Sequence, residues 1–121
     1  MRIISFAWTT PAVIKKIKTC TRREWDDNYA SRFNAGDFLA GYDRNPRYEG
    51  SQITTIKLTE KPYKERYCDV PDSDWFTEGF EYLQSIGAKV RGFSPRQIWL
   101  EWKADTTQCY VVRFEYCETL I

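Results

Sequence analysis

The segment that most constrains the fold is the stretch of residues 109–116, in which apolar and charged side chains alternate. A period of two residues is typical of a β-strand that buries one face. Arg113 and Glu115 point away from that face. The side chains predicted to share it are Tyr110, Val112, Phe114 and Tyr116. A half-apolar strand of this kind favours a curved antiparallel sheet or a small barrel.

The remaining segments mix strands and helices without the strand–helix–strand rhythm of a parallel sheet. Further strands are predicted at residues 2–6, 38–40 and 52–59, and helices at residues 24–33 and 72–86. Two more helices begin where a hydroxyl residue precedes a proline, at Thr10-Pro11 and Ser94-Pro95. The buried side of the first of these is expected to carry Val13, Ile14 and Ile17. This order of elements predicts an α+β fold.

The chain has 121 residues, of which 42% are hydrophobic and 17% aromatic. That is enough to bury one core and too little for two, so we expect a single domain spanning residues 1–121. The first residues lack the charged and long apolar stretches of a signal peptide, and no segment approaches a transmembrane span. No membrane partner is therefore expected. Four cysteines without a C-x-x-C pair favour free thiols in the reducing cytoplasm.

The chain contains no histidine. This excludes Ser-His-Asp and Cys-His catalysis and leaves no histidine for a zinc site. Acid–base chemistry must then use Lys, Glu, Asp, Tyr or Cys side chains. The net charge of +1 is also far below that of proteins that hold nucleic acid mainly by bulk charge. A small substrate is therefore favoured over a long nucleic acid.

The densest polar cluster is the KTCTRR segment that follows the first predicted helix. Its threonines favour an extended conformation, in which Lys18 shares one face with Cys20 and Arg22. Thr21 and Arg23 share the other face. A turn at the helix exit would bring Lys18 and Thr21 together, and a desolvated lysine can take a hydroxyl proton. The alternative is a purely structural role, as a lysine-flanked strand that leaves a helix.

Glu78 is the second candidate for chemistry. It lies within the predicted helix 72–86, with Trp75 and Tyr82 on the same face. An aromatic setting would partly desolvate its carboxylate, as a general acid–base group requires. The alternative is a glutamate at the rim of a solvated helix. Gly79 is unusual here, because a mid-helix glycine costs ~1 kcal/mol relative to alanine. Close packing or access for a small ligand would account for it.

Trp8 lies in a polar loop before the first helix, which makes it a candidate for stacking on a nucleobase. The alternative is a lid over the core. A local basic cluster is formed by Lys15, Lys16, Lys18, Arg22 and Arg23. The sequence leaves open whether Lys15 and Lys16 belong to a binding surface or to a solvated helix edge.

The KTCTRR segment resembles the K-x-x-T-x-R signature of the ASCH domain, a PUA-like β-barrel family. The resemblance continues through Trp25, Gly36 with Asp37, the segments ITTIKLT and EGFEYL, and the final strand YVVRFEY, so that it spans nearly the whole chain. The family often has a glycine two positions before the lysine, where this chain has Lys16. The resemblance implies a small, mostly antiparallel β-barrel flanked by helices.

Some small bacterial members of that family are amidohydrolases that act on N(4)-acetylcytidine and related nucleosides. The resemblance therefore implies an amidohydrolase that removes the acyl group from N(4)-acylated cytidine nucleosides, without metal or cofactor. It carries the catalytic set over to Lys18, Thr21 and Glu78. Arg23 and Trp8 are predicted to bind substrate, and Arg23 either holds the signature turn or polarises the acyl carbonyl.

Two alternatives remain at this stage. The first is an RNA-binding module of the PUA-like class, with or without ribonuclease activity, because ASCH domains were first proposed to bind RNA. The second is a regulatory domain with a decayed site, against which the presence of all three catalytic candidates argues. The preferred acyl group and the oligomeric state do not follow from the sequence.

Overall fold

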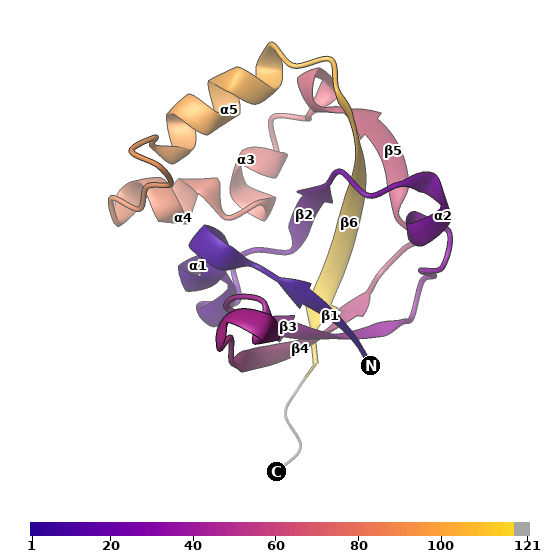
Figure 1. The fold of residues 1–121 in the computed structure, drawn as a ribbon. Coiled ribbons are helices and arrows are strands. Elements are labelled where there is room, and N and C mark those ends of the chain that lie inside the picture. Colours follow the sequence, from indigo (N-terminus) through magenta and orange to yellow (C-terminus); the bar gives the residue numbers. More distant parts are fainter. Residues whose placement is uncertain (118–121) are drawn as a thin grey trace.

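The computed structural model describes residues 1–117. Its centre is a curled six-stranded sheet that forms a half-barrel, with a group of helices beside it (Figure 1). In spatial order the strands are β1 (Arg2–Ser5), β3 (Phe38–Tyr42), β4 (Gln52–Leu58), β6 (Gln108–Tyr116) and β2 (Cys20–Arg23), and β5 (Tyr63–Arg66) also pairs with β6. Among these strands β1 and β3 run parallel, and every other pair is antiparallel. The predicted α+β class and mostly antiparallel barrel are confirmed.

Strand β6 joins the two halves of the sheet and runs the length of the molecule in Figure 1. It pairs with β2 along one edge and with β4 and β5 in succession along the other. The predicted alternation holds for Val112 and Phe114, which are buried on the face predicted to be apolar. The opposite face is also covered, because Cys109 and Val111 are buried there. Arg113 on that face pairs with Asp74 instead of facing water.

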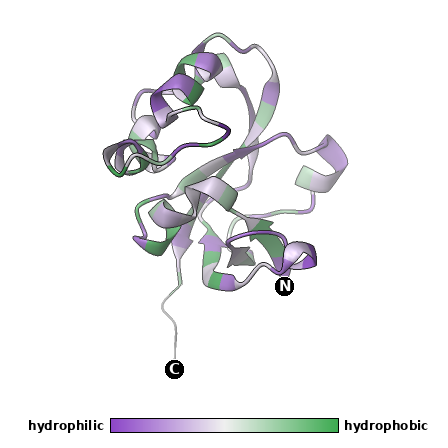
Figure 2. Cartoon of the chain, turned by 60° about the vertical axis from the view of Figure 1, so that its left-hand side comes forward, coloured by the Kyte–Doolittle hydropathy of each residue, from purple (hydrophilic) through white to green (hydrophobic). Residues whose placement is uncertain are grey.

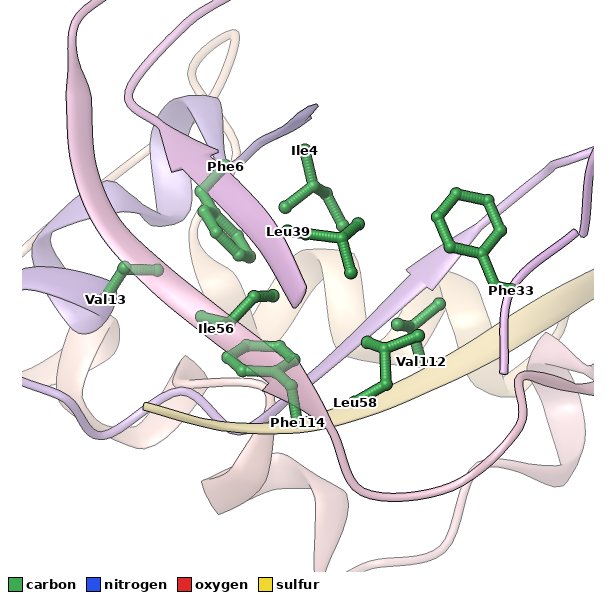
Figure 3. Close-up of a cluster of buried hydrophobic side chains, with 9 residues drawn as sticks. All are labelled: Ile4, Phe6, Val13, Phe33, Leu39, Ile56, Leu58, Val112 and Phe114. Carbon is green, nitrogen blue, oxygen red and sulfur yellow. The ribbon is translucent and has the colours of Figure 1, made fainter. Parts of the chain in front are cut away.

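The curled sheet encloses an apolar core (Figure 3). Its nine buried side chains come from the strands, from the first helix, and from the chain just after β1 and after α2: Ile4, Phe6, Val13, Phe33, Leu39, Ile56, Leu58, Val112 and Phe114. Aliphatic and aromatic side chains on a pleated surface interdigitate well, and their removal from water is the main force that holds the sheet together.

Five helices accompany the sheet in the described part of the chain: α1 (Thr10–Ile14), α2 (Asp27–Ala30), α3 (Asp74–Thr77), α4 (Phe80–Ser85) and α5 (Pro95–Lys103). Short 3₁₀ turns occur at Ala7–Thr9, Pro46–Tyr48 and Tyr67–Asp69. Helix α5 begins where predicted, with Ser94 and Gln97 forming a reciprocal capping box. The helices carry apolar and polar residues side by side, as expected for helices that bury one face (Figure 2).

Helices α3, α4 and α5 pack around a second cluster, centred on Phe80 and Leu83. Four of its partly buried members are tryptophans from the 3₁₀ turn Ala7–Thr9 and from α3 and α5: Trp8, Trp75, Trp99 and Trp102. Phe80 contacts all four rings, at centroid distances of 5.5, 5.8, 6.1 and 5.1 Å respectively. Most of the tryptophans therefore serve this helical layer.

Three sequence predictions about helices were wrong in extent, and the first two concern the N-terminal part of the chain. The predicted helix 24–33 is a single turn, α2, because Asp26 caps its start by accepting from the Tyr29 amide. The expected aromatic cluster nevertheless forms, with Trp25 stacked on Phe33 at 4.6 Å between ring centroids. Helix α1 ends at Ile14, whose side chain is 62% exposed instead of buried.

The predicted helix 72–86 is broken at Gly79, which has a φ of +86°. An added Cβ on Gly79 would lie 2.6 Å from the Ala12 Cβ and 3.3 Å from the Lys18 Cβ. Close packing and a left-handed backbone together require glycine there. The break also removes the shared helical face predicted for Trp75, Glu78 and Tyr82.

The described residues include no helix that combines the length and the apolar character needed to cross a membrane. The four cysteines, Cys20, Cys68, Cys109 and Cys117, are free thiols, as predicted.

Candidate active site

A cavity of about 470 Å³ opens between β2, the 3₁₀ turn Ala7–Thr9 and the helices α4 and α5. All five sequence-predicted site residues line it: Trp8, Lys18, Thr21, Arg23 and Glu78. Its volume lies in the range of sites that hold small molecules. The five predicted residues thus lie together at one cavity, although the surroundings of each side chain differ from the prediction.

The exit of helix α1 directs Lys18 into this cavity. The Ile17 amide donates to the Ala12 carbonyl and the Lys16 amide to the Val13 carbonyl, which is the pattern of a Schellman motif. Lys16 adopts a φ of +58° at the position where such motifs usually carry glycine. The departure from the family pattern at this position therefore leaves the turn in place. The Lys18 amide also donates to the Ala12 carbonyl. The Thr19 amide donates to the Thr77 carbonyl and joins the start of β2 to the end of α3.

Lys18 is only 1% exposed, although its side chain ends in an ammonium group. Its Nζ donates to Glu78 twice, to Oε1 at 2.8 Å and to the backbone carbonyl at 2.9 Å. The lysine stem passes against Gly79, where a side chain would obstruct it. The glycine that breaks the helix thus creates the space through which Lys18 reaches the Glu78 carboxylate.

Glu78 is the C-cap of α3 and is 2% exposed. Its second oxygen, Oε2, accepts from Arg22 at 2.8 Å and lies 3.7 Å from the Cys20 sulfur. The prediction of an aromatic environment was therefore wrong, because cations hold both oxygens of this carboxylate. The signal was present in the sequence: Lys18, Cys20 and Arg22 were predicted to share one face of the extended segment, and that face meets Glu78.

The Lys18–Glu78 ion pair belongs to a larger network of ion pairs. Arg22 bridges Glu78 to Asp74 at 2.6 Å and to Glu65 at 2.8 Å, and Arg113 donates to both oxygens of Asp74. Three cations face three carboxylates, so their charges balance within this network. Every buried side-chain nitrogen and oxygen of the described residues has a hydrogen-bond partner, as a buried charged network requires.

The network shifts the titration of its members. Burial raises the pKa of Asp74, but hydrogen bonds from Arg113, Arg22 and Thr77 outweigh it and lower that pKa to about 2. Burial, reinforced by the neighbouring Glu78, raises the pKa of the Cys20 thiol far above its usual range. Cys20 therefore stays a neutral thiol and is not a nucleophile.

Thr21 points to the other side of β2 and is 4% exposed. Its hydroxyl oxygen accepts from Arg23 Nε at 3.2 Å, and Arg23 also donates to the Ser5 carbonyl at 2.7 Å. Burial lowers the pKa of the Arg23 guanidinium. Within residues 1–117 the Thr21 hydroxyl donates no hydrogen bond to protein, and none joins it directly to Lys18. Arg23 thus fixes the hydroxyl and leaves its proton available.

The walls of the cavity are aromatic. Trp8 and Trp102 are half-buried and line it together with Phe80, which is 1% exposed. Trp8 packs against Phe80 at 5.5 Å between ring centroids. The two roles considered for Trp8, a lid over the core and a surface for stacking on a base, are compatible, since the ring covers part of a core and also lines the cavity. Trp102 and Asp74 were missed by the sequence reasoning, although Asp74 lies one helical turn before Glu78.

The basic cluster predicted from the sequence is not one surface. Lys18 and Arg22 are buried in ion pairs, whereas Lys15 and Lys16 are exposed at the end of α1. Lys15 and Lys16 thus form the solvated helix edge. The described residues contain no group of acidic, cysteine or histidine side chains arranged to hold a metal ion.

No protein-family model matches this sequence, and no curated protein matches it either. Two solved structures share the fold across 95% of the chain. A protein from Enterococcus faecalis V583 of the DUF984 family aligns with a TM-score of 0.59 and 15% identity over 78% of its own length. The ASCH domain from Lactobacillus crispatus JV V101 aligns with a TM-score of 0.54 and 11% identity over 79% of its length. The chain thus has the fold of an ASCH domain.

Proposed function

We propose that this protein is an amidohydrolase that removes the acyl group from N(4)-acylated cytidine nucleosides. Lys18, Thr21 and Glu78, from here on the catalytic set, carry the reaction. The observation that carries the proposal is their arrangement: all three line one cavity, and Lys18 and Glu78 are in contact at 2.8 Å. In this proposal Thr21 is the nucleophile, Lys18 the base and Glu78 the acid, so that no histidine is needed.

The Lys18–Glu78 contact supplies the protons. Transfer of one proton from Nζ to Oε1 converts the ion pair into a neutral amine and a carboxylic acid. The two carboxylate oxygens have separate roles, since Arg22 holds Oε2 while Oε1 faces Lys18.

Acyl transfer then follows in two halves. The neutral amine of Lys18 accepts the hydroxyl proton as Thr21 Oγ attacks the acyl carbon, and Glu78 protonates the departing N(4) amine. Cytidine leaves and an acyl ester on Thr21 remains. Glu78, again a carboxylate, accepts a proton from the attacking water. The attack breaks the ester and frees the carboxylic acid, while the Lys18 ammonium returns a proton to Thr21 Oγ. The proton on Glu78 then passes to the Lys18 amine, which restores the ion pair. Catalytic hydrogen bonds often tighten only when substrate is bound, so the absence of a direct Lys18–Thr21 bond among the described residues is compatible with this route.

The aromatic walls match the substrate class. Trp8 and Trp102 provide flat apolar surface for a pyrimidine ring, and base–aromatic stacking contributes about 1–3 kcal/mol per base. Arg23 keeps Thr21 in place by hydrogen bonding and lies beside the position of the acyl carbonyl. It is therefore a positioning residue with a donor group next to the developing oxyanion.

The competing function is an RNA-binding module of the PUA-like class. The same cavity accepts an unpaired base in either case. The surface argues against a long strand, because Lys18 and Arg22 are neutralised by buried carboxylates and leave few exposed cations of the basic cluster to contact phosphates.

The test uses Thr21, because it lies outside the ion-pair network and can be changed with the least effect on folding. Thr21→Ala should lower the rate of cytidine release from N(4)-acetylcytidine at least ~100-fold, whereas Thr21→Ser should retain part of it. Adding Lys18→Met to Thr21→Ala should cost little more, since members of a catalytic unit are not additive.

Thr19→Ala is the matched control, because Thr19 lies two residues away and does not line the cavity. It should keep turnover within a few-fold of the natural protein, and circular dichroism should show that all variants are folded. Turnover by a folded Thr21→Ala protein at the natural rate would refute the mechanism. An inactive natural protein would transfer the assignment to the RNA-binding module.

A further inference from the structure

The charges of the cavity do not cancel. The lysine and the arginine of its floor, Lys18 and Arg22, are balanced by the buried network. Arg23 is bonded only to neutral oxygens, and Arg91 takes part in no ion pair among the described residues. One carboxylate, that of Glu24, also lines the cavity. A positive excess therefore remains for a ligand to neutralise.

Arg91 lies at the edge of the cavity in an unusual turn. Val90 and Phe93 exchange backbone hydrogen bonds of 3.0 and 2.8 Å, and the two residues between them, Arg91 and Gly92, have φ values of +51° and +81°. Positive φ at both central positions is the pattern of a type I′ turn, where Asn, Asp or Gly ordinarily precede the glycine. An arginine there is strained, and backbone outliers of this kind cluster at ligand-binding sites.

The exposure of the side chains that line the cavity increases from its floor to its rim. The catalytic set is at most 4% exposed and forms the floor. Trp8 and Trp102 are half-buried and form the walls, while Arg91 and Glu24 are exposed at the rim. In cytidine the N(4) amine and the ribose are attached at opposite ends of the pyrimidine ring. With the acyl amide on the floor, the ring lies between the walls and the ribose points to the rim.

The rim differs between its two sides. Next to Glu24 and Trp102 lies a second hollow of about 510 Å³, which both residues also line and which carries the carboxylates of Glu101 and Asp105. These carboxylates repel the phosphates of a nucleic-acid strand that would leave the cavity on that side. Arg91 thus provides a cationic position for one phosphate, beside a region that disfavours the next phosphates of a strand.

We infer that the substrate is a mononucleotide, an N(4)-acylated cytidine 5′-monophosphate, whose phosphate binds Arg91 at the rim. This inference rests on the proposed function and names its substrate class. A guanidinium matches the oxygens of a phosphate in a bidentate fashion, and charge-assisted hydrogen bonds of this kind are the strong ones.

The experiment compares deacylation of N(4)-acetylcytidine, its 5′-monophosphate, and a short single-stranded RNA with one internal N(4)-acetylcytidine. The natural protein should show a kcat/KM about ten- to a hundredfold higher for the monophosphate than for the nucleoside. Arg91→Gln should reduce that ratio to near one. Lys89→Gln, which removes an exposed cation from the same connection but does not line the cavity, should preserve the ratio.

Equal kcat/KM values for nucleoside and monophosphate, or an undiminished ratio in folded Arg91→Gln, overturn the inference and leave the amidohydrolase standing. A higher value for the RNA than for the monophosphate also overturns it, in favour of a strand. If no substrate is deacylated, the proposed function fails. The phosphate site is then tested by calorimetry, which compares the affinity for cytidine 5′-monophosphate with that for cytidine. Binding of the monophosphate at least about tenfold tighter, and lost in Arg91→Gln, then supports the phosphate site, whereas equal binding refutes it.

Discussion

The two faces of strand β6 lead into two interior regions that are chemically opposite. On one face Val112 and Phe114 enter an apolar core in which all nine buried members are hydrophobic. On the other, Arg113 joins a network of three cations and three carboxylates around Asp74 and Glu78. Both regions are densely packed, but dispersion and the hydrophobic effect hold the first, whereas matched charges hold the second.

The difference teaches where the molecule tolerates change. An apolar core accepts a swap of similar volume, because the attraction is non-directional and neighbours repack. A buried charged network does not, because removing one charge leaves its partners desolvated and unpaired. Shape-conserving substitutions therefore separate the two regions better than truncations do, since truncation costs several kcal/mol in both.

The largest effect is expected for Asp74→Asn, which keeps the shape and removes the charge. Arg22 and Arg113 then lose their shared partner, and the free energy of unfolding should fall by about 3–5 kcal/mol in denaturant titrations. The matched control is Asp72→Asn, whose side chain is 97% exposed although it pairs with Lys103. It should change stability by less than ~1 kcal/mol. Equal losses in the two variants would show that the network is no more sensitive than the surface.

An intermediate effect is expected on acidification. The pKa of Asp74 in the folded protein is about 2, below the ordinary value of 3.8, so the unfolded chain takes up the proton first. Above the ordinary pKa of 3.8 the ionised carboxylate contributes roughly 2 kcal/mol to the free energy of unfolding, and this contribution is lost as the pH falls through about 2. Unfolding free energies measured between pH 5 and pH 2 should therefore fall more steeply for the natural protein than for Asp74→Asn. Parallel curves would contradict this.

The smallest effect is expected in the apolar core. Leu39 is fully buried, and Leu39→Met conserves its volume. The unfolding free energy should drop by less than ~1.5 kcal/mol, while Leu39→Ala should lose about 2–5 kcal/mol through the cavity it leaves. Thermal and denaturant unfolding of both variants measures this. A Leu39→Met loss as large as that of Asp74→Asn would remove the distinction between the two regions.

Local patterns in the sequence predicted the class of the fold. The alternation around Val112 and the Ser94-Pro95 helix start depend on neighbouring residues, so the chain itself shows them. The length of the helices did not follow in the same way. The helix 72–86 is broken because Ala12 and Lys18 approach Gly79. The unusual glycine was consistent with close packing, but its neighbours in the sequence do not show which distant segments it packs against.

Several residues that line the cavity were predicted from the sequence, but their environment was not. Lys18, Thr21, Arg23 and Glu78 follow from the signature and the resemblance, and they line one cavity. The partners of the acids come from other elements, as when Arg113 of β6 meets Asp74. Such pairings depend on strand order, which the residue patterns left undetermined.

The position of β6 has a consequence for how the protein forms. Within the described sheet, β2 pairs only with β6, and Thr21 lies opposite Val112. During synthesis Thr21 leaves the ribosome long before Val112, so β2 waits without a strand partner while the intervening chain appears. Pairings between such distant segments form slowly, because the loop between them must first close. The proposed nucleophile is thus assembled by one of the last steps of folding, and an incomplete chain has no competent site.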